Sequence, residues 1–183
     1  MERQEALNLL EKYTKNKNLV KHGLAVEAVM KHFAKLNEED TEKWGVIGLL
    51  HDIDYEKYPE EHCKKCVDIL KEEGFDDSTI KSIQSHGYGI CVDVKPEQFM
   101  EKVLYTIDEL TGLVIATALM KPNKKLAEVD LQSLKKKWKT KGFAAGVNRE
   151  IIQNGADMLG LELDYILEQT LIAMQEISEE LGL

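Results

Sequence analysis

The stretch GLLHDIDYEKYPEEH, residues 48–62, contains an apolar run that ends directly on a histidine and an aspartate. Leu49 and Leu50 are expected to face the core, and His51 and Asp52 follow them without a break. An ionised carboxylate that is buried without a partner costs several kcal/mol. The pair therefore lies either outside the core or beside a positively charged partner, and the rest of the sequence favours a metal ion.

The segments around this stretch have helical periodicity. Residues 18–37 carry an apolar stripe with the spacing i, i+3, i+7, i+10 and i+14, and residues 40–52 open with an acidic turn. Only residues 89–94 have a short pattern typical of a strand. Further helices are predicted over 59–74, 76–87, 96–120, 147–159 and 163–181. We therefore predict an all-α fold.

Composition narrows the class of protein. A chain of 183 residues with 43% hydrophobic residues is long enough for one well-packed domain, with or without an extension. The net charge of −9 argues against general nucleic-acid binding, because phosphate backbones require a basic surface. The N-terminus has no signal-peptide core, and no apolar run has membrane-spanning length. Three cysteines, an odd number, fit a reducing compartment, so a cytoplasmic protein without membrane partners is expected.

Six polar side chains fall on apolar faces of the predicted helices or directly at their ends. Any one of them is more often a hydrogen-bonded or ion-paired core residue. Six such residues on five helices would each need a partner of their own, and a single shared cation is the simplest partner for all of them. Imidazole and carboxylate ligands suit Mn, Fe, Co or Zn, and an oxygen-rich site tolerates Mg. The predicted ligands are His22, His51, Asp52, His62, His86 and Asp108.

The order His22, His51-Asp52 and then Asp108 in YTIDELTG resembles the H…HD…D signature of the HD-domain metal-dependent phosphohydrolases. The resemblance covers about residues 18–118. It implies an HD-domain helical bundle with a metal site in its core, in which these four residues hold a first divalent ion.

A subset of that family holds two metals and has two further histidines between the HD pair and the last aspartate. His62 and His86 occupy such positions, and SHGYG (85–89) looks like the His-x-x-Gly of bacterial dinucleoside-tetraphosphate hydrolases in the superfamily. The resemblance therefore implies a second ion held by His62 and His86, with Asp52 as the bridge between the two.

The sequence also departs from the family pattern. The common HDIGK is here HDIDY (51–55), so a lysine that could touch substrate phosphate is missing. Asp54 is expected either to act with Asp52 in catalysis, by orienting water or a ligand, or to cap a helix end. Beyond residue 120 the chain is similar to uncharacterised predicted HD hydrolases of bacteria and archaea. We expect residues 1–120 to form the metal-binding part and residues 121–183 to pack on it as a C-terminal helical extension, within one structural unit.

The extension begins with a basic segment. Residues 121–141 have a net charge of +6, whereas the rest of the chain carries −15. If the segment covers the bundle mouth, then Lys121, Lys124 and Arg149 attract a phosphorylated substrate; the alternative is a solvated lysine-rich loop. Trp138 either stacks a base or anchors this loop to the core.

Two other features have simpler explanations. Cys63 and Cys66 form a single C-x-x-C without a second pair, so we expect ordinary thiols, with Cys66 in the core. The last helix, rich in Leu and Met, either closes the domain's own core or forms a homodimer face.

These observations favour one function over two others. The leading hypothesis is hydrolysis of a phosphomonoester or phosphoanhydride of a nucleotide or small metabolite by a metal-activated water. One alternative is a di-iron oxygenase of the same superfamily. The other is a non-catalytic regulatory module in which the metal is structural.

Overall fold

Helices form all the regular structure of the protein, in a computed structural model that describes residues 1–183. Outside the helices there is one isolated bridge, between Tyr88 and Val92, so the prediction of an all-α fold is confirmed. In chain order the elements are α1 (Arg3–Tyr13), α2 (Lys17–Leu36), α3 (Thr41–Leu50), the 3₁₀ turn η1 (Pro59–Glu61), α4 (Lys65–Glu72), α5 (Asp77–Gln84), the 3₁₀ turn η2 (Ser85–Gly87), α6 (Phe99–Leu119), the 3₁₀ turn η3 (Leu126–Glu128), α7 (Leu131–Lys139), α8 (Arg149–Leu159), α9 (Leu163–Glu176) and α10 (Ser178–Leu181).

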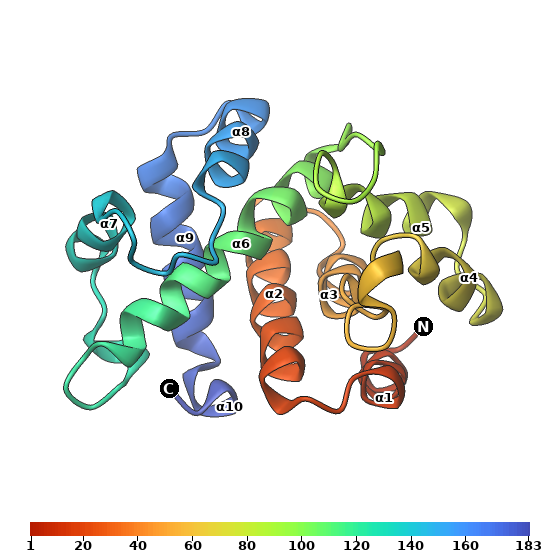
Figure 1. Ribbon diagram of the computed structural model, residues 1–183, viewed down its shortest axis with the longest axis horizontal. Coiled ribbons are helices and arrows are strands. Elements are labelled where there is room, and N and C mark those ends of the chain that lie inside the picture. Colours follow the sequence, from red (N-terminus) through yellow and green to blue (C-terminus); the bar gives the residue numbers. More distant parts are fainter.

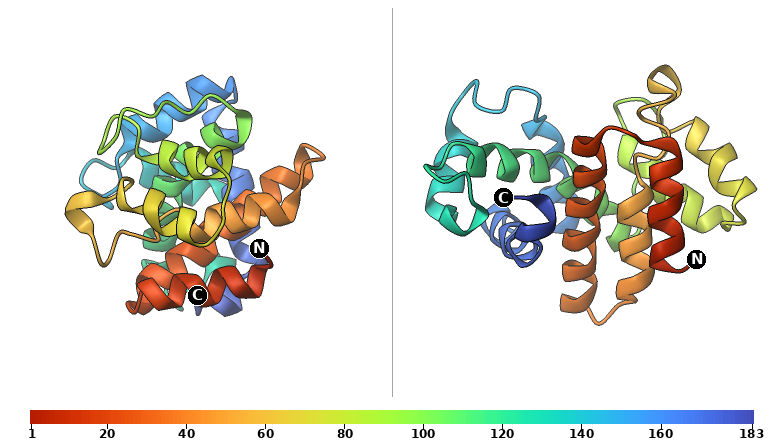
Figure 2. Two further views of the ribbon diagram at one scale, coloured as in Figure 1. Left: turned by 90° about the vertical axis from the view of Figure 1, so that its right-hand side faces the viewer. Right: turned by 90° about the horizontal axis from the view of Figure 1, so that it is seen from below.

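Helix α6 crosses the middle of the molecule and connects its two halves (Figure 1). It packs against α2 on one side and against α7, α8 and α9 on the other. Side chains all around α6 are buried, as expected for a helix enclosed by others. The right-hand view of Figure 2 shows α2, α3 and α1 side by side, with α4 and α5 next to them.

A single hydrophobic core extends through both predicted parts of the chain. It includes Leu50 and Leu104 from the first 120 residues and Leu134, Ile152 and Met174 from the remainder. The apolar side chains of the last helices thus close the domain's own core, the first of the two roles considered for them. None of the helices is both long and apolar enough to cross a lipid bilayer.

The prediction of one continuous helix over residues 59–74 is wrong. The chain forms η1, leaves helical geometry at His62 and Cys63, and begins α4 only at Lys65. The break coincides with a contact to an earlier part of the chain, in which the carboxylate of Asp54 accepts the backbone N–H of Cys66 at 2.7 Å. This contact satisfies a free N–H group at the start of α4.

The lysine-rich segment is also more ordered than a solvated loop. Residues 131–139 form α7, whose first turn is closed by a reciprocal pair of bonds between Asp130 and Ser133. Leu134 is fully buried and Trp138 packs against the core. The lysines of α7 therefore occupy the outer face of a packed helix.

Candidate metal centre

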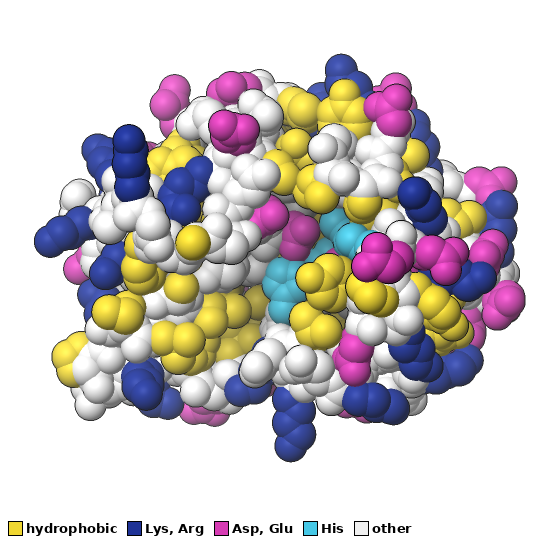
Figure 3. Space-filling model, in the orientation of Figure 1, with side chains coloured by type: hydrophobic (Ala, Val, Ile, Leu, Met, Phe, Trp, Pro, Cys, Tyr) yellow, Lys and Arg dark blue, Asp and Glu magenta, His cyan; other side chains and the backbone are white.

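The six predicted ligands come together from five separate segments. His22 lies on α2, His51 and Asp52 follow α3, His62 precedes α4, His86 lies in η2 and Asp108 lies on α6. Figure 3 shows the histidine side chains beside acidic ones in a hollow near the centre of one face.

Close packing of α2 on α3 brings His22 beside His51. A Cβ atom at Gly23 would be 3.2 Å from the carbonyl oxygen of Leu49, and one at Gly48 would be 3.1 Å from that of Val26. Both separations are too short for most side chains, so glycine at these positions allows the backbones to approach. As a result the two imidazole Nε2 atoms are 3.1 Å apart.

The first group of ligand atoms contains His22, His51 and one oxygen each from Asp108 and Asp52. Asp108 Oδ1 lies 2.9 Å from His22 Nε2 and 3.3 Å from His51 Nε2. Asp52 Oδ2 lies 3.6 and 3.4 Å from the same two atoms. With bonds of about 2.1 Å, ligand atoms are about 3.0 Å apart around an octahedral ion and about 3.4 Å apart around a tetrahedral one. The group therefore fits a divalent cation.

The second group contains His62, His86 and the other oxygen of Asp52. The two Nε2 atoms are 3.3 Å apart, and Asp52 Oδ1 lies 3.5 Å from that of His62 and 3.4 Å from that of His86. Asp52 thus directs one oxygen at each group, which is the arrangement of a bridging carboxylate.

Hydrogen bonds on the opposite ring nitrogens orient three of the imidazoles. Nδ1 of His51 lies 2.8 Å from the carbonyl oxygen of Gly48, and Nδ1 of His86 lies 2.6 Å from that of Ile83. Nδ1 of His62 lies 2.8 Å from Oδ1 of Asp54. Because each Nδ1 donates its proton to these acceptors, the lone pair of Nε2 faces the site, as in metal-ligating histidines.

The site concentrates charge even without an ion. Burial disfavours ionised carboxylates, but the neighbouring imidazoles hold the pKa values of Asp52 and Asp108 well below the usual range. Burial would likewise lower the pKa of His51, yet the two carboxylates raise it well above its ordinary value. In the metal-free protein, the carboxylates thus favour a proton on His51, which supplies positive charge that a cation would otherwise supply.

Asp54 lies behind the ligands rather than in the pocket. It is fully buried, and its two oxygens accept from His62 Nδ1 and from the backbone N–H of Cys66. The geometry therefore gives Asp54 an orienting role for His62, and also the helix-capping role that the sequence left open.

A pocket of about 420 Å³ opens above the ligand groups. Leu19, Ile90 and Val147 form apolar parts of its wall, beside Tyr55 and Glu109. Burial raises the pKa of Glu109, although its carboxylate also accepts the backbone N–H of Asn148. A second pocket, of about 480 Å³, lies next to α3 and α5 and contains none of the ligand residues.

The three residues predicted to contact substrate phosphate, Lys121, Lys124 and Arg149, are not among those that line the pocket above the ligand groups. Lys121 and Lys124 follow the far end of α6, three turns beyond Asp108. The Arg149 guanidinium donates to the carbonyl oxygens of Lys137, Trp138 and Phe143 and lies 5.8 Å from the centre of the Trp138 ring. Arg149 and Trp138 thus fasten the loop that leads to α8, which accords with the anchoring role considered for Trp138.

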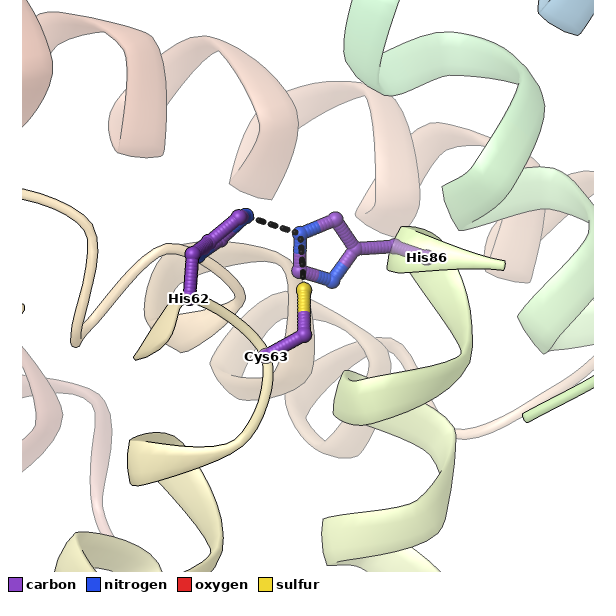
Figure 4. Close-up of side chains that lie close together, drawn as sticks. All are labelled: His62, Cys63 and His86. Atoms are coloured by element: carbon purple, nitrogen blue, oxygen red, sulfur yellow. Dashed lines mark hydrogen bonds between the residues drawn. The ribbon is translucent and has the colours of Figure 1, made fainter. Parts of the chain in front are cut away.

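Cys63 joins the second group, which the sequence interpretation did not anticipate. It follows His62 directly, and its Sγ lies 3.5 Å from Nε2 of His86 (Figure 4). The side chain is completely buried, and burial raises the pKa of its thiol. The only sequence signal for Cys63 was its position next to the predicted ligand His62. In the continuous helix expected over residues 59–74, the side chains of His62 and Cys63 would have pointed in different directions. Cys66 lies in the core as predicted.

Comparison with known proteins adds one result. Neither the curated proteins nor the solved structures gave a match. A family profile described as HD domain matches residues 19–130, which is more than half of the chain and includes all six predicted ligands. The fold, the ligand spacing and this match agree, and the chain belongs to the HD domain family.

Proposed function

We propose that the protein is a metal-dependent phosphohydrolase that acts on a phosphomonoester or phosphoanhydride of a nucleotide or other small metabolite. The observation that carries the proposal is the position of Asp52, whose two oxygens face two separate groups of ligand atoms. Divalent ions bound there would lower the pKa of a coordinated water and polarise a phosphoryl oxygen. Imidazole and carboxylate donors of this kind suit Mn, Fe, Co, Zn and Mg.

The charge of the pocket supports a phosphate substrate only in combination with cations. Its lining contains Asp52, Asp108 and Glu109 but no lysine or arginine. The metal-free pocket therefore offers a phosphate group no fixed positive charge, and bound ions would supply the attraction. The protein should bind phosphate only when it is loaded with metal.

Two further properties of the pocket concern the oxygen that leaves the phosphorus and the rest of the substrate molecule. Glu109 lies at the pocket wall, next in sequence to the predicted ligand Asp108. We assign Glu109 Oε as the donor of the proton that the leaving oxygen requires. A volume of about 420 Å³ suits a mononucleotide-sized molecule, and Leu19, Ile90 and Val147 offer apolar contacts to its base.

The test is metal content together with phosphate release, for the wild type and Asp52→Ala. We expect one or two equivalents of metal in the wild type, release of inorganic phosphate from some members of a nucleotide and sugar-phosphate panel, and loss of both in the variant. A wild type that binds no metal after reconstitution would overturn the proposal. Two equivalents of iron with substrate-dependent oxygen consumption would instead establish the oxygenase, because the same six ligands fit that centre.

A further inference from the structure

Cys63 has an unusual position beside the second ligand group. Four non-glycine residues in the chain have positive φ, and Cys63, at +61°, is the only buried one. The left-handed conformation costs a non-glycine residue roughly 1–2 kcal/mol. Here it directs the side chains of His62 and Cys63, which are neighbours in sequence, toward the same point (Figure 4).

The adjoining backbone leaves room for the sulfur. A Cβ atom at Gly87 would lie 2.4 Å from Sγ of Cys63 and 2.6 Å from Sγ of Cys91. Glycine directly after His86 thus allows the Cys63 thiol to approach that imidazole. The thiol, His62 Nε2 and His86 Nε2 all lie within 4.8 Å of one another.

Four of the separations among these donor atoms match the edges of a tetrahedral zinc site. With bonds of about 2.05 Å to nitrogen and about 2.3 Å to sulfur, tetrahedral angles place two nitrogens about 3.3 Å apart and a nitrogen and a sulfur about 3.6 Å apart. The observed distances are 3.3 Å between the two Nε2 atoms and 3.5 Å between His86 Nε2 and Cys63 Sγ. Asp52 Oδ1 completes the donor set at 3.4 and 3.5 Å from the same nitrogens.

We propose that Cys63 is a thiolate ligand of the second ion, together with His62, His86 and Asp52, and that this position takes Zn²⁺ in preference to Mg²⁺ or Mn²⁺. The inference rests on the proposed metal centre and deepens it. On binding, an S–Zn bond replaces the S–H bond and the proton leaves to solvent. A thiolate selects softer ions, whereas the first group offers only nitrogen and oxygen donors and is not selective in this way.

Cobalt substitution under anaerobic conditions tests this assignment. Thiolate bound to Co²⁺ produces an intense charge-transfer absorption in the near ultraviolet, which nitrogen and oxygen ligands do not give. We expect this band in the Co²⁺-loaded wild type, retention in Cys66→Ala and Cys91→Ser, and loss in Cys63→Ser. Zinc affinity at the second position should fall more than about 100-fold in Cys63→Ser, beyond the effect typical of an orienting residue, while the first position keeps its ion.

The outcomes distinguish failure of the proposed metal centre from failure of the Cys63 assignment. If the wild type binds no Co²⁺, the metal centre itself is refuted. If it binds two equivalents without the charge-transfer band, or if the band persists in Cys63→Ser, only the role of Cys63 is refuted. Cys63→Gly is a second variant that lacks the thiol and adopts positive φ without strain, and circular dichroism of both variants checks that the fold is retained.

Discussion

The replacement of Asp54 by asparagine tests how the second ligand group is held in place. Asp54 is fully buried, and its carboxylate accepts from His62 Nδ1 at 2.8 Å and from the Cys66 backbone N–H at 2.7 Å. An asparagine of the same shape has one acceptor and one donor, so it satisfies only one of these groups. If its amide NH₂ faces His62, the imidazole must carry its proton on Nε2, which then cannot bind a metal.

The magnitude follows from two separate arguments. A hydrogen bond to a charged group contributes about 1.5–3 kcal/mol. Loss of the partner that orients a metal-ligating histidine typically costs about 10–100-fold in metal affinity, which corresponds to about 1.4–2.8 kcal/mol. We therefore expect Asp54→Asn to weaken the second ion by about 10–100-fold. The first ion should be unaffected, because Asp54 contacts neither His22 nor Asp108.

Competition of the loaded protein with a chromophoric chelator measures both affinities. The matched control is Asp68→Asn, because Asp68 lies on the exposed face of α4 and pairs only with Lys65. The control should leave both affinities unchanged. A loss of less than about threefold at the second position, or equal losses at both positions in a folded variant, would refute the orienting role of Asp54.

Four further outcomes are expected. Removal of metal by a chelator should lower the Tm of the wild type by about 5–10 °C for each ion present at 100 times its Kd, since such an ion contributes about 2.7 kcal/mol. The chelator should not change the Tm of Asp52→Ala. A decrease in Asp52→Ala equal to that of the wild type would contradict the ligand assignment. Gly155→Ala should lower the free energy of unfolding in urea by about 1–3 kcal/mol, because the new Cβ would lie 2.0 Å from Oγ1 of Thr106 on α6. The control Gly146→Ala, where a Cβ would meet open space, should change it by less than about 0.5 kcal/mol. Arg149→Lys should lower Tm without changing KM, and a raised KM at unchanged Tm would restore its phosphate role. The pKa of His51 is raised above its ordinary 6.5, so its protonation stabilises the metal-free protein fully below about pH 6.5 and progressively less as pH rises through the raised value. Because the proton and the metal compete for His51, metal affinity measured by titration should increase with pH above 6.5. An affinity that does not change with pH would exclude this competition.

Much of the fold and the first ligand group could be predicted because the signals were periodic and local. His22, His51 and Asp108 interrupt apolar stripes whose burial was clear from their spacing. Helix α7 was missed although Leu131, Leu134 and Trp138 have helical spacing and Asp130 precedes them as a cap. The charge of the lysines concealed this narrow apolar face.

The second group was harder to predict because it depends on tertiary contacts. The helix break before α4 coincides with a hydrogen bond of Asp54 to Cys66, twelve residues away in sequence. Only this break turns His62 and Cys63 toward His86. Periodicity describes which face of a regular helix is buried, but it carries no information about side chains at the point where a helix ends.

The bridging position of Asp52 has a thermodynamic consequence for the order of ion uptake. One carboxylate provides an oxygen to each group, so the first cation to bind fixes the rotamer that the other group requires. The conformational entropy of that side chain is then lost only once, and each ion increases the affinity for the other by the same factor. The coupling is limited to the rotamer entropy of one short side chain, so the two ions should bind with modest positive cooperativity while each position keeps an affinity set by its own ligands.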